Sequence, residues 1–134
     1  MTEYVLDANI VAEILKSDAV VLNRFQELSA GEHEFLACPI VFYEVKRGLL
    51  WRDAHKQMLI FEHLFDDFTW QDYTSDDWNL AAELWAKRRV LGRPISETDL
   101  LIAVFARNRG AVLVTRNLKD FEELDLSLEN WAST

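Results

Sequence analysis

The sequence has few of the residues that build covalently or metal-stabilised folds, with one cysteine, two prolines and four glycines among 134 residues. The single thiol, Cys38, excludes an intrachain disulfide, and no cysteine–histidine group has zinc-site spacing. Long apolar runs are also absent. Acidic residues interrupt residues 1–18, unlike a secretory signal, and no stretch approaches a membrane span. We therefore expect a cytoplasmic protein with no membrane partner.

Basic residues are scarce as well. The chain has 14 Lys and Arg against 23 Asp and Glu, which gives a net charge of −9. A negative net charge argues against a protein that binds nucleic acid by neutralising many phosphates. It is compatible with an enzyme whose carboxylates hold divalent cations, because bound cations reverse the local field that a phosphate meets.

The apolar content is sufficient for one folded domain. Half of the residues are hydrophobic, and the length is close to the commonest domain size. There is no repeat, low-complexity segment or linker, so we interpret residues 1–134 as a single domain.

Apolar periodicity predicts strands that alternate with helices. The expected strands span residues 4–6, 35–38, 68–70 and 111–114, with a further edge strand in the tail, 125–134. The expected helices span residues 10–15, 20–28, 39–51, 53–65, 74–90, 96–109 and, briefly, 117–124. This alternation predicts a three-layer α/β/α fold, with a central, mainly parallel sheet of four or five strands.

Acidic residues stand where the predicted strands end or the predicted helices begin. Asp7 follows the first strand, Asp99 opens a helix that is apolar nearly all round, and Asp120 follows the 111–114 strand. Ligands bind beyond the carboxyl ends of strands in such a sheet, so these acids are candidate site residues. Each also has a simpler explanation as part of a helix cap, and taken singly that alternative stays open.

Glu44 is a candidate for a different reason. On a helix that starts at Pro39, it lies on the same side as Val41 and Val45, so a carboxylate is placed on the packing face. A buried carboxylate without a partner is costly. Glu44 therefore meets a bound cation, forms a salt bridge or reaches solvent at the edge of the core.

These acids carry more information together than singly. Three or four neighbouring carboxylates repel one another and raise one another's pKa unless a hard cation balances them. Oxygen ligands without histidine or cysteine suit Mg²⁺ or Mn²⁺ rather than zinc. A site of this kind activates water and stabilises the charge that develops on a phosphodiester.

Three segments carry a resemblance to a known family: YVLDANI, PIVFYEVKRG and GRPISETDLLIAVFARNRGAVLVTRNLKDFEEL. Over essentially its whole length the sequence resembles the PIN-domain ribonucleases of the VapC type, which are toxins of prokaryotic toxin–antitoxin pairs. The last segment is the most specific, because it joins a G-R-P-I loop, an Asp-opened buried helix, an R-x-R-G turn and a strand closing in V-T-x-N.

The resemblance implies that Asp7, Glu44 and Asp99 are metal-binding acids. Asn9 and Thr115 are then the polar residues that steady Asp7 by hydrogen bonds.

There is one departure from the family pattern. Many PIN domains have a fourth acid where this chain has Asn117, which leaves this residue among the polar neighbours of the site. Asp120 is the first candidate to replace that acid as a catalytic residue, and Glu122 is the second. The number of metal ions therefore stays open.

The activity that the resemblance implies is Mg²⁺-dependent endonucleolytic hydrolysis of RNA by activated water, with Mn²⁺ as an alternative ion. Arg88, Arg93, Arg116 and Lys119 are then candidates to contact the RNA backbone. Single-stranded or loop RNA is the expected substrate, because a site in a crevice does not reach into a regular duplex. The relatives form homodimers and are silenced by a small VapB-like antitoxin, and we expect both here.

Two other functions are compatible with parts of the sequence. A phosphatase of the haloacid-dehalogenase type needs a second acid two residues after the first, where this chain has Asn9. A PIN-like module that binds RNA or an antitoxin without cutting is compatible with Asn117. The five Trp residues are interpreted as core or dimer contacts. The RNA target and the cleavage sequence depend on loop shape and are not predicted.

Overall fold

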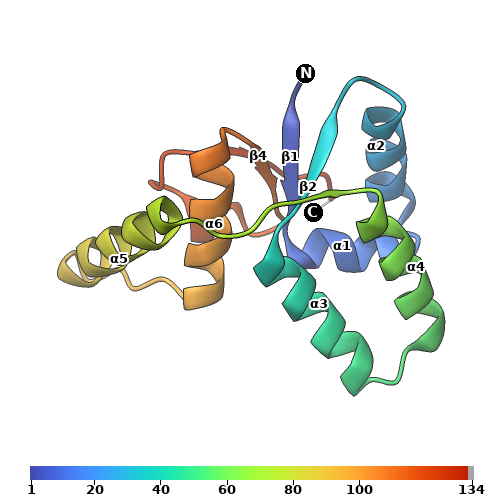
Figure 1. Cartoon of the computed structure of the whole chain (residues 1–134), viewed down its shortest axis with the longest axis horizontal. Helices are drawn as coiled ribbons and strands as arrows, with labels where there is room; N and C mark the ends of the chain where they lie inside the picture. The colour runs from blue at the N-terminus through green and yellow to red at the C-terminus, as the bar shows by residue number, and fades with distance from the viewer. Residues whose placement is uncertain (133–134) are drawn as a thin grey trace.

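The computed structural model describes residues 1–132 as a five-stranded sheet with helices on both sides (Figure 1). The strands are β1 (Glu3–Leu6), β2 (Glu34–Ala37), β3 (Thr69–Trp70), β4 (Val112–Val114) and β5 (Ser127–Glu129). The helices are α1 (Ala8–Leu15), α2 (Ala19–Ser29), α3 (Pro39–Trp51), α4 (His55–Asp66), α5 (Ser75–Val90) and α6 (Glu97–Arg109), with one 3₁₀ turn, η1 (Leu118–Phe121).

The sheet is parallel at every pairing, in the order β3-β2-β1-β4-β5. The three-layer α/β/α prediction is thus confirmed. The predicted edge strand in the tail is β5, and residues 133–134 of that tail lie outside the described residues. Parallel strands need right-handed crossovers. Figure 1 accordingly shows α5 and α6 on one side of the strands, and α1, α2 and α4 on the other.

Most predicted elements have bounds within one or two residues of the observed ones, and two of the differences have a visible backbone cause. The fourth helix begins at His55 rather than Asp53, because Asp53 has a φ of 55°, which is outside the helical region. The expected helix over residues 117–124 is shorter, since only η1 forms and Glu123 has a φ of 66°. Both differences lie at element boundaries and leave the order of elements as predicted.

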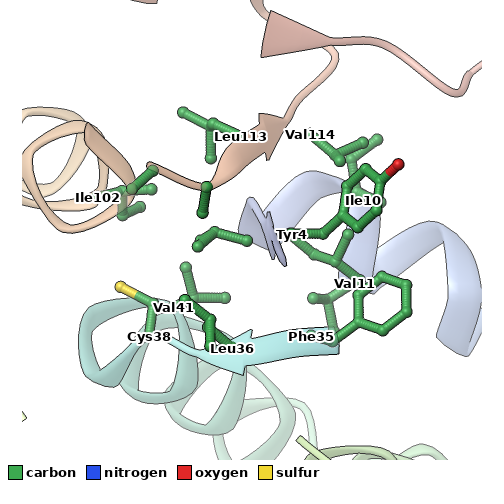
Figure 2. Packing of buried hydrophobic residues seen from close by; sticks show 14 of the residues in the cluster. Tyr4, Ile10, Val11, Phe35, Leu36, Cys38, Val41, Ile102, Leu113 and Val114 are labelled. Carbon is green, nitrogen blue, oxygen red and sulfur yellow. The ribbon is translucent and has the colours of Figure 1, made fainter. Parts of the chain in front are cut away.

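The core forms around the central strand. Tyr4, Val5 and Leu6 of β1 are buried, and side chains from β2, β4 and the flanking helices close around them (Figure 2). Helix α6 is buried through most of its length, as its all-round apolar sequence predicts. Both faces of β1 are thus covered, which holds the residue that follows it in a fixed place.

The tryptophans only partly follow the prediction. Trp131 belongs to the core, where its ring lies beside Tyr4 and Phe35. The other four are exposed by 41% to 89% of their surface, which excludes the core alternative and leaves the predicted dimer contact for Trp51, Trp70, Trp78 and Trp85. Their neighbours within this chain are too few to cover these large rings.

Among residues 1–132, no helix is long and apolar enough to cross a membrane.

Candidate active site

The sheet order creates a crevice at one edge. From β1 the chain crosses to β2 on one side, and later returns past β1 to form β4 on the other side. The carboxyl ends of β1 and β4 therefore flank a topological switch point, where α/β proteins bind their ligands. The register pairs Leu6 with Val114, so the next residues, Asp7 and Thr115, are neighbours at this crevice.

The Asp7 carboxylate is buried and fixed by three hydrogen bonds. The Thr115 hydroxyl donates to Oδ2 at 2.8 Å, and the Asn9 amide donates to the same oxygen at 3.4 Å. The backbone N–H of Ala8 donates to Oδ1 at 2.8 Å, so Asp7 also caps α1. The cap occupies one oxygen only. Asp7 therefore has the predicted capping role, and its carboxylate is held by hydrogen bonds at the switch point.

Asn9 links the Asp7 carboxylate to the loop after β4. Its amide nitrogen lies 3.5 Å from the Thr115 hydroxyl oxygen, and its amide oxygen accepts from the backbone N–H of Arg116 at 3.2 Å. The predicted positions of Asn9 and Thr115 beside Asp7 agree with this geometry.

Burial raises the pKa of Asp7, since a charged carboxylate loses hydration there. The hydrogen bonds from Thr115 and Ala8 oppose this rise, but the negative charges of Asp99 and Asp120 add to it. The net effect is a raised pKa, so the ionised form of this carboxylate is less stable in the folded protein than in water.

Asp99 lies in the first turn of α6, whose N-terminus faces the same end of the sheet as the carboxyl end of β1 (Figure 1). The predicted cap is present, because the Ser96 hydroxyl accepts from the backbone N–H of Asp99 at 3.2 Å. This bond uses the backbone of Asp99 rather than its carboxylate. Burial raises the pKa of Asp99, Ser96 opposes the rise, and the charge of Asp120 adds to it.

Glu44 is half-buried on α3 and lines a pocket together with Ala8 and Asn9 of α1. Within residues 1–132 it forms no ion pair, so the salt-bridge alternative finds no support. Burial raises the pKa of Glu44, as does the charge of Asp7, while Arg47 lowers it and Asp99 raises it.

Asp120 and Asn117 differ in their relation to the other acids. Asp120 is exposed on η1, and its charge reaches both Asp7 and Asp99. The backbone N–H of Asn117 donates to the Thr115 hydroxyl at 3.1 Å, while the Asn117 side chain is exposed. Asn117 therefore supports Thr115 through its backbone.

The four acids fit a hard cation by chemistry and electrostatics. They offer carboxylate oxygens alone, and the pKa values of Asp7, Glu44 and Asp99 are raised partly by one another or by Asp120. Among the described residues, no three acidic, histidine or cysteine side chains converge closely enough to form a ready-made ligand set. An ion such as Mg²⁺ would supply the positive charge that this group lacks.

Three of the four cations predicted to contact RNA have partners within the protein. Arg116 pairs with Glu13 at 2.7 Å, and Arg93 pairs with Glu123 at 2.6 Å. The guanidinium of Arg88 donates to the backbone carbonyl oxygen of Arg93 at 2.8 Å. Lys119 is exposed and forms no ion pair within residues 1–132. These contacts attach the loop before α6 and the loop after β4 to the rest of the fold.

A second buried carboxylate was not expected from the sequence. Asp77 of α5 is completely buried, and Arg109 at the end of α6 binds both of its oxygens, at 2.9 and 3.1 Å. Burial acts to raise the pKa of Asp77, but the bonds from Arg109, the Thr74 backbone and Asn108 outweigh it and lower the pKa. The sequence around Thr74 and Asp77 indicates a capping box. It does not indicate that Arg109, far along the chain, pairs with Asp77.

With this geometry in place, the chain can be compared with known proteins. Residues 4–126 match the PIN domain family. Ribonuclease VapC2 of Haemophilus influenzae is 30% identical over 135 residues, covering 98% of this chain and 99% of that protein. VapBC2 from Rickettsia felis, solved bound to a DNA fragment from its promoter, has a TM-score of 0.87 at 25% identity, covering 98% of this chain and 100% of that one.

A third similar protein shares the fold. VapBC-1 from nontypeable Haemophilus influenzae has a TM-score of 0.81 at 24% identity and covers 97% of this chain and 98% of that one. The family match spans most of the chain, and the acids at the switch point lie inside it. The chain therefore belongs to the PIN-domain family, among the VapC-type ribonucleases.

Proposed function

We propose that the protein is a divalent-metal-dependent endoribonuclease that serves as the toxin of a toxin–antitoxin pair. The observation that carries this proposal is the Asp7 carboxylate, held by Thr115 and Asn9 at the switch point of the sheet. Burial and, to a smaller extent, its acidic neighbours raise its pKa, and Asp7 forms no ion pair within residues 1–132. Family membership supports RNA as the substrate.

Each residue has a separate task in this proposal. Asp7, Glu44 and Asp99 would hold Mg²⁺ or Mn²⁺, with Asp120 as a fourth acid at the exposed side. When bound, such an ion polarises the phosphodiester and makes a nearby water more acidic. Thr115 and Asn9 fix the orientation of Asp7, so that its oxygens need little rearrangement during the reaction.

The proposed reaction is a hydrolysis in which water oxygen bonds to the scissile phosphorus as the bond from phosphorus to the 3′-oxygen breaks. The leaving oxygen takes up a proton, so the products are a 5′-phosphate and a 3′-hydroxyl. Asp120 is exposed at the mouth of the crevice, where a carboxylate can accept the proton that water releases. Alignment of water and phosphate at the acids would supply much of the rate.

A module that binds RNA or an antitoxin without cutting it is the second candidate. One observation favours it: Asn117 stands where many PIN domains have an acid. The acids around Asp7 argue against binding of RNA without a metal ion, because carboxylates repel phosphates unless a cation neutralises them.

The test is cleavage of a mixed single-stranded RNA pool by purified protein in Mg²⁺, in Mn²⁺ and in EDTA. We expect metal-dependent cutting that disappears in Asp7→Asn and Asp99→Asn. Asp76→Asn is the matched control, because Asp76 is an exposed acid of α5 away from the switch point. Asp120→Asn tests the fourth acid.

A folded wild-type protein that leaves every RNA intact in both metals would contradict the proposed ribonuclease activity. Cutting that continues unchanged in Asp7→Asn would move the active site away from the switch point. Circular dichroism of each variant separates loss of activity from loss of fold.

A VapB-like antitoxin is the proposed partner. The support is the similarity to VapBC2 and VapBC-1, which are named as complexes. An acidic crevice attracts a cationic protein segment, since opposite charges steer association. Addition of such a partner should stop RNA cleavage at one equivalent, and continued cleavage by the saturated complex would contradict this role.

A homodimer is the proposed assembly. An apolar groove of about 410 Å³ lies between α5 and α6, lined by Trp78, Ala81, Ala82, Trp85, Glu97, Leu100 and Leu101. Exposed tryptophans are typical of surfaces that another protein covers. We expect light scattering to give twice the chain mass and Trp85→Glu to give the monomer mass; a monomeric wild type would contradict the dimer.

A further inference from the structure

A second pocket, with charged residues among a largely apolar lining, lies beside the acids. It has a volume of about 260 Å³ and is bounded by one face of α1, one face of α3 and the start of α4. Its lining includes Asn9, Lys16, Glu44, Gly48 and Arg52. One end contains Glu44 and Asn9, whose amide bonds Asp7. The pocket is therefore continuous with the proposed metal site.

The other end of the pocket is cationic. Lys16 ends α1 and Arg52 ends α3, and both side chains line the cavity. Neither forms an ion pair or a side-chain hydrogen bond with any of residues 1–132, unlike Arg93, Arg109 and Arg116. Two unpaired cations thus share a pocket in a chain whose net charge is −9.

Gly48 allows the guanidinium of Arg52 to lie along its own helix. A Cβ at Gly48 would be 3.3 Å from Nη1 of Arg52, and no other atom comes within 4 Å of that position. Gly48 is one helical turn after Glu44, so Arg52 extends back toward the acidic end of the pocket. A planar guanidinium in this position suits two-point binding of a phosphate.

The net charge at the Lys16 and Arg52 end of the pocket indicates which kind of ligand binds there. Two helices end here, and each carboxyl terminus carries about half a negative charge. The side chains of Lys16 and Arg52 contribute two positive charges, so roughly one positive charge remains. That balance favours an anion, and a free volume equal to roughly nine waters admits a phosphate with its sugar rather than paired strands.

We propose that this pocket binds a backbone phosphate of the RNA close to the phosphate that is cut, through Arg52 and Lys16. The inference rests on the proposed ribonuclease function and adds the subsite that positions a single strand across the acids. The RNA then spans the pocket, with one phosphate at its cationic end and another beside Asp7 and Glu44.

The experiment measures binding without cleavage. A fluorescein-labelled single-stranded RNA is titrated with the protein in EDTA, and anisotropy is recorded at several salt concentrations. Each phosphate contact contributes about 0.7 to the slope of log K against log salt for single strands. We expect Arg52→Ala and Lys16→Ala each to reduce the slope by about 0.7. For each variant the affinity should fall by about tenfold, the size of one lost charged hydrogen bond.

Two further variants remove the ambiguities of charge and folding. Arg24→Ala removes the same charge from α2, outside the pocket, and should leave affinity and slope near wild type. Gly48→Ala keeps every charge and favours the helix, and its Cβ moves Nη1 of Arg52 by a few tenths of an ångström. We expect Gly48→Ala to weaken RNA binding less than Arg52→Ala does, without loss of stability.

Unchanged RNA binding in Arg52→Ala, Lys16→Ala and Gly48→Ala would overturn the subsite. If these variants instead release only a VapB-like partner, the pocket belongs to an acidic segment of that protein and the proposal is also wrong. Cleavage in Mg²⁺ is assayed separately on the same samples. If the nuclease function is wrong, the wild-type protein does not cut RNA in Mg²⁺. If only the subsite is wrong, the wild type cuts RNA and the variants bind RNA with wild-type affinity.

Discussion

Asp77 and Asp7 are both buried carboxylates, yet their surroundings move their pKa values in opposite directions. Asp77 has the guanidinium of Arg109 on both oxygens, so its charge is balanced within the chain. Within residues 1–132, Asp7 has hydrogen-bond donors but no basic side chain as a partner, and burial and the charge of Asp99 raise its pKa. The difference separates a carboxylate that holds two helices together from one that we propose binds a metal ion.

The strongest test of this comparison is removal of the cation from Asp77. Arg109→Ala leaves a buried charge without a partner, and we expect a loss of about 3–5 kcal/mol in the free energy of unfolding, measured by urea denaturation. A loss below about 1 kcal/mol, as for an exposed pair, would mean that Asp77 is not the balanced carboxylate described here.

Removal of a donor from Asp7 should affect metal binding more than the fold. Thr115→Val keeps the side-chain volume but loses the hydroxyl that donates to Oδ2, so we expect Mn²⁺ affinity to fall by about 10- to 100-fold in calorimetry. Thr69→Val, on the exposed edge strand β3, serves as the control. Wild-type affinity in Thr115→Val would show that this hydrogen bond does not prepare Asp7 for a cation.

Neutralising one of the unbalanced acids should stabilise the metal-free protein. Asp99 is half-buried with a raised pKa, so Asp99→Asn in EDTA at pH 7 should add up to about 1 kcal/mol, after allowance for solvent screening. The sign follows from the raised pKa. The stability that Asp99 contributes when protonated is fully present below its unfolded pKa and is lost as pH rises through its folded pKa.

The stability difference between D99N and wild type should therefore be small in acid and grow as pH rises. Thermal unfolding at a series of pH values measures it, with Asp76→Asn as the matched exposed acid. A variant less stable than wild type at pH 7 would contradict the raised pKa. Asp77 has the opposite dependence, because its lowered pKa gives stability that is lost as pH falls.

The smallest expected effect is the loss of stability in Arg93→Ala, which gives a reference for the loss in Arg109→Ala. Arg93 and Glu123 form an ion pair at 2.6 Å with more than half of each side chain exposed, so Arg93→Ala should cost less than about 1 kcal/mol in the same urea experiment. A cost equal to that of Arg109→Ala would remove the contrast between a screened pair and a buried one.

The fold and the position of Asp7 followed from local patterns. Apolar runs that stop at an acid predict a strand end, and the parallel sheet then places such ends along one edge. The Ser96 cap was also readable, because capping acts over three residues.

Ion pairs and pockets between residues far apart in the chain could not be predicted from the sequence. Nothing near Arg109 in the sequence points to Asp77, which lies 32 residues away. For the same reason, the partners that hold Arg93 and Arg116 were missed and both were predicted to contact RNA. Lys16 and Arg52 were passed over because their shared pocket exists only once α1 and α3 pack.

The hydrogen bond that orients Asp7 joins residues 108 positions apart in the chain. During translation, β1 and Asp7 leave the ribosome early, whereas β4 and Thr115 leave only when most of the chain has been made. Domains assemble as their segments emerge, so the bond cannot form on a nascent or C-terminally truncated chain. The order of synthesis therefore delays assembly of the carboxylate site until β4 has been made.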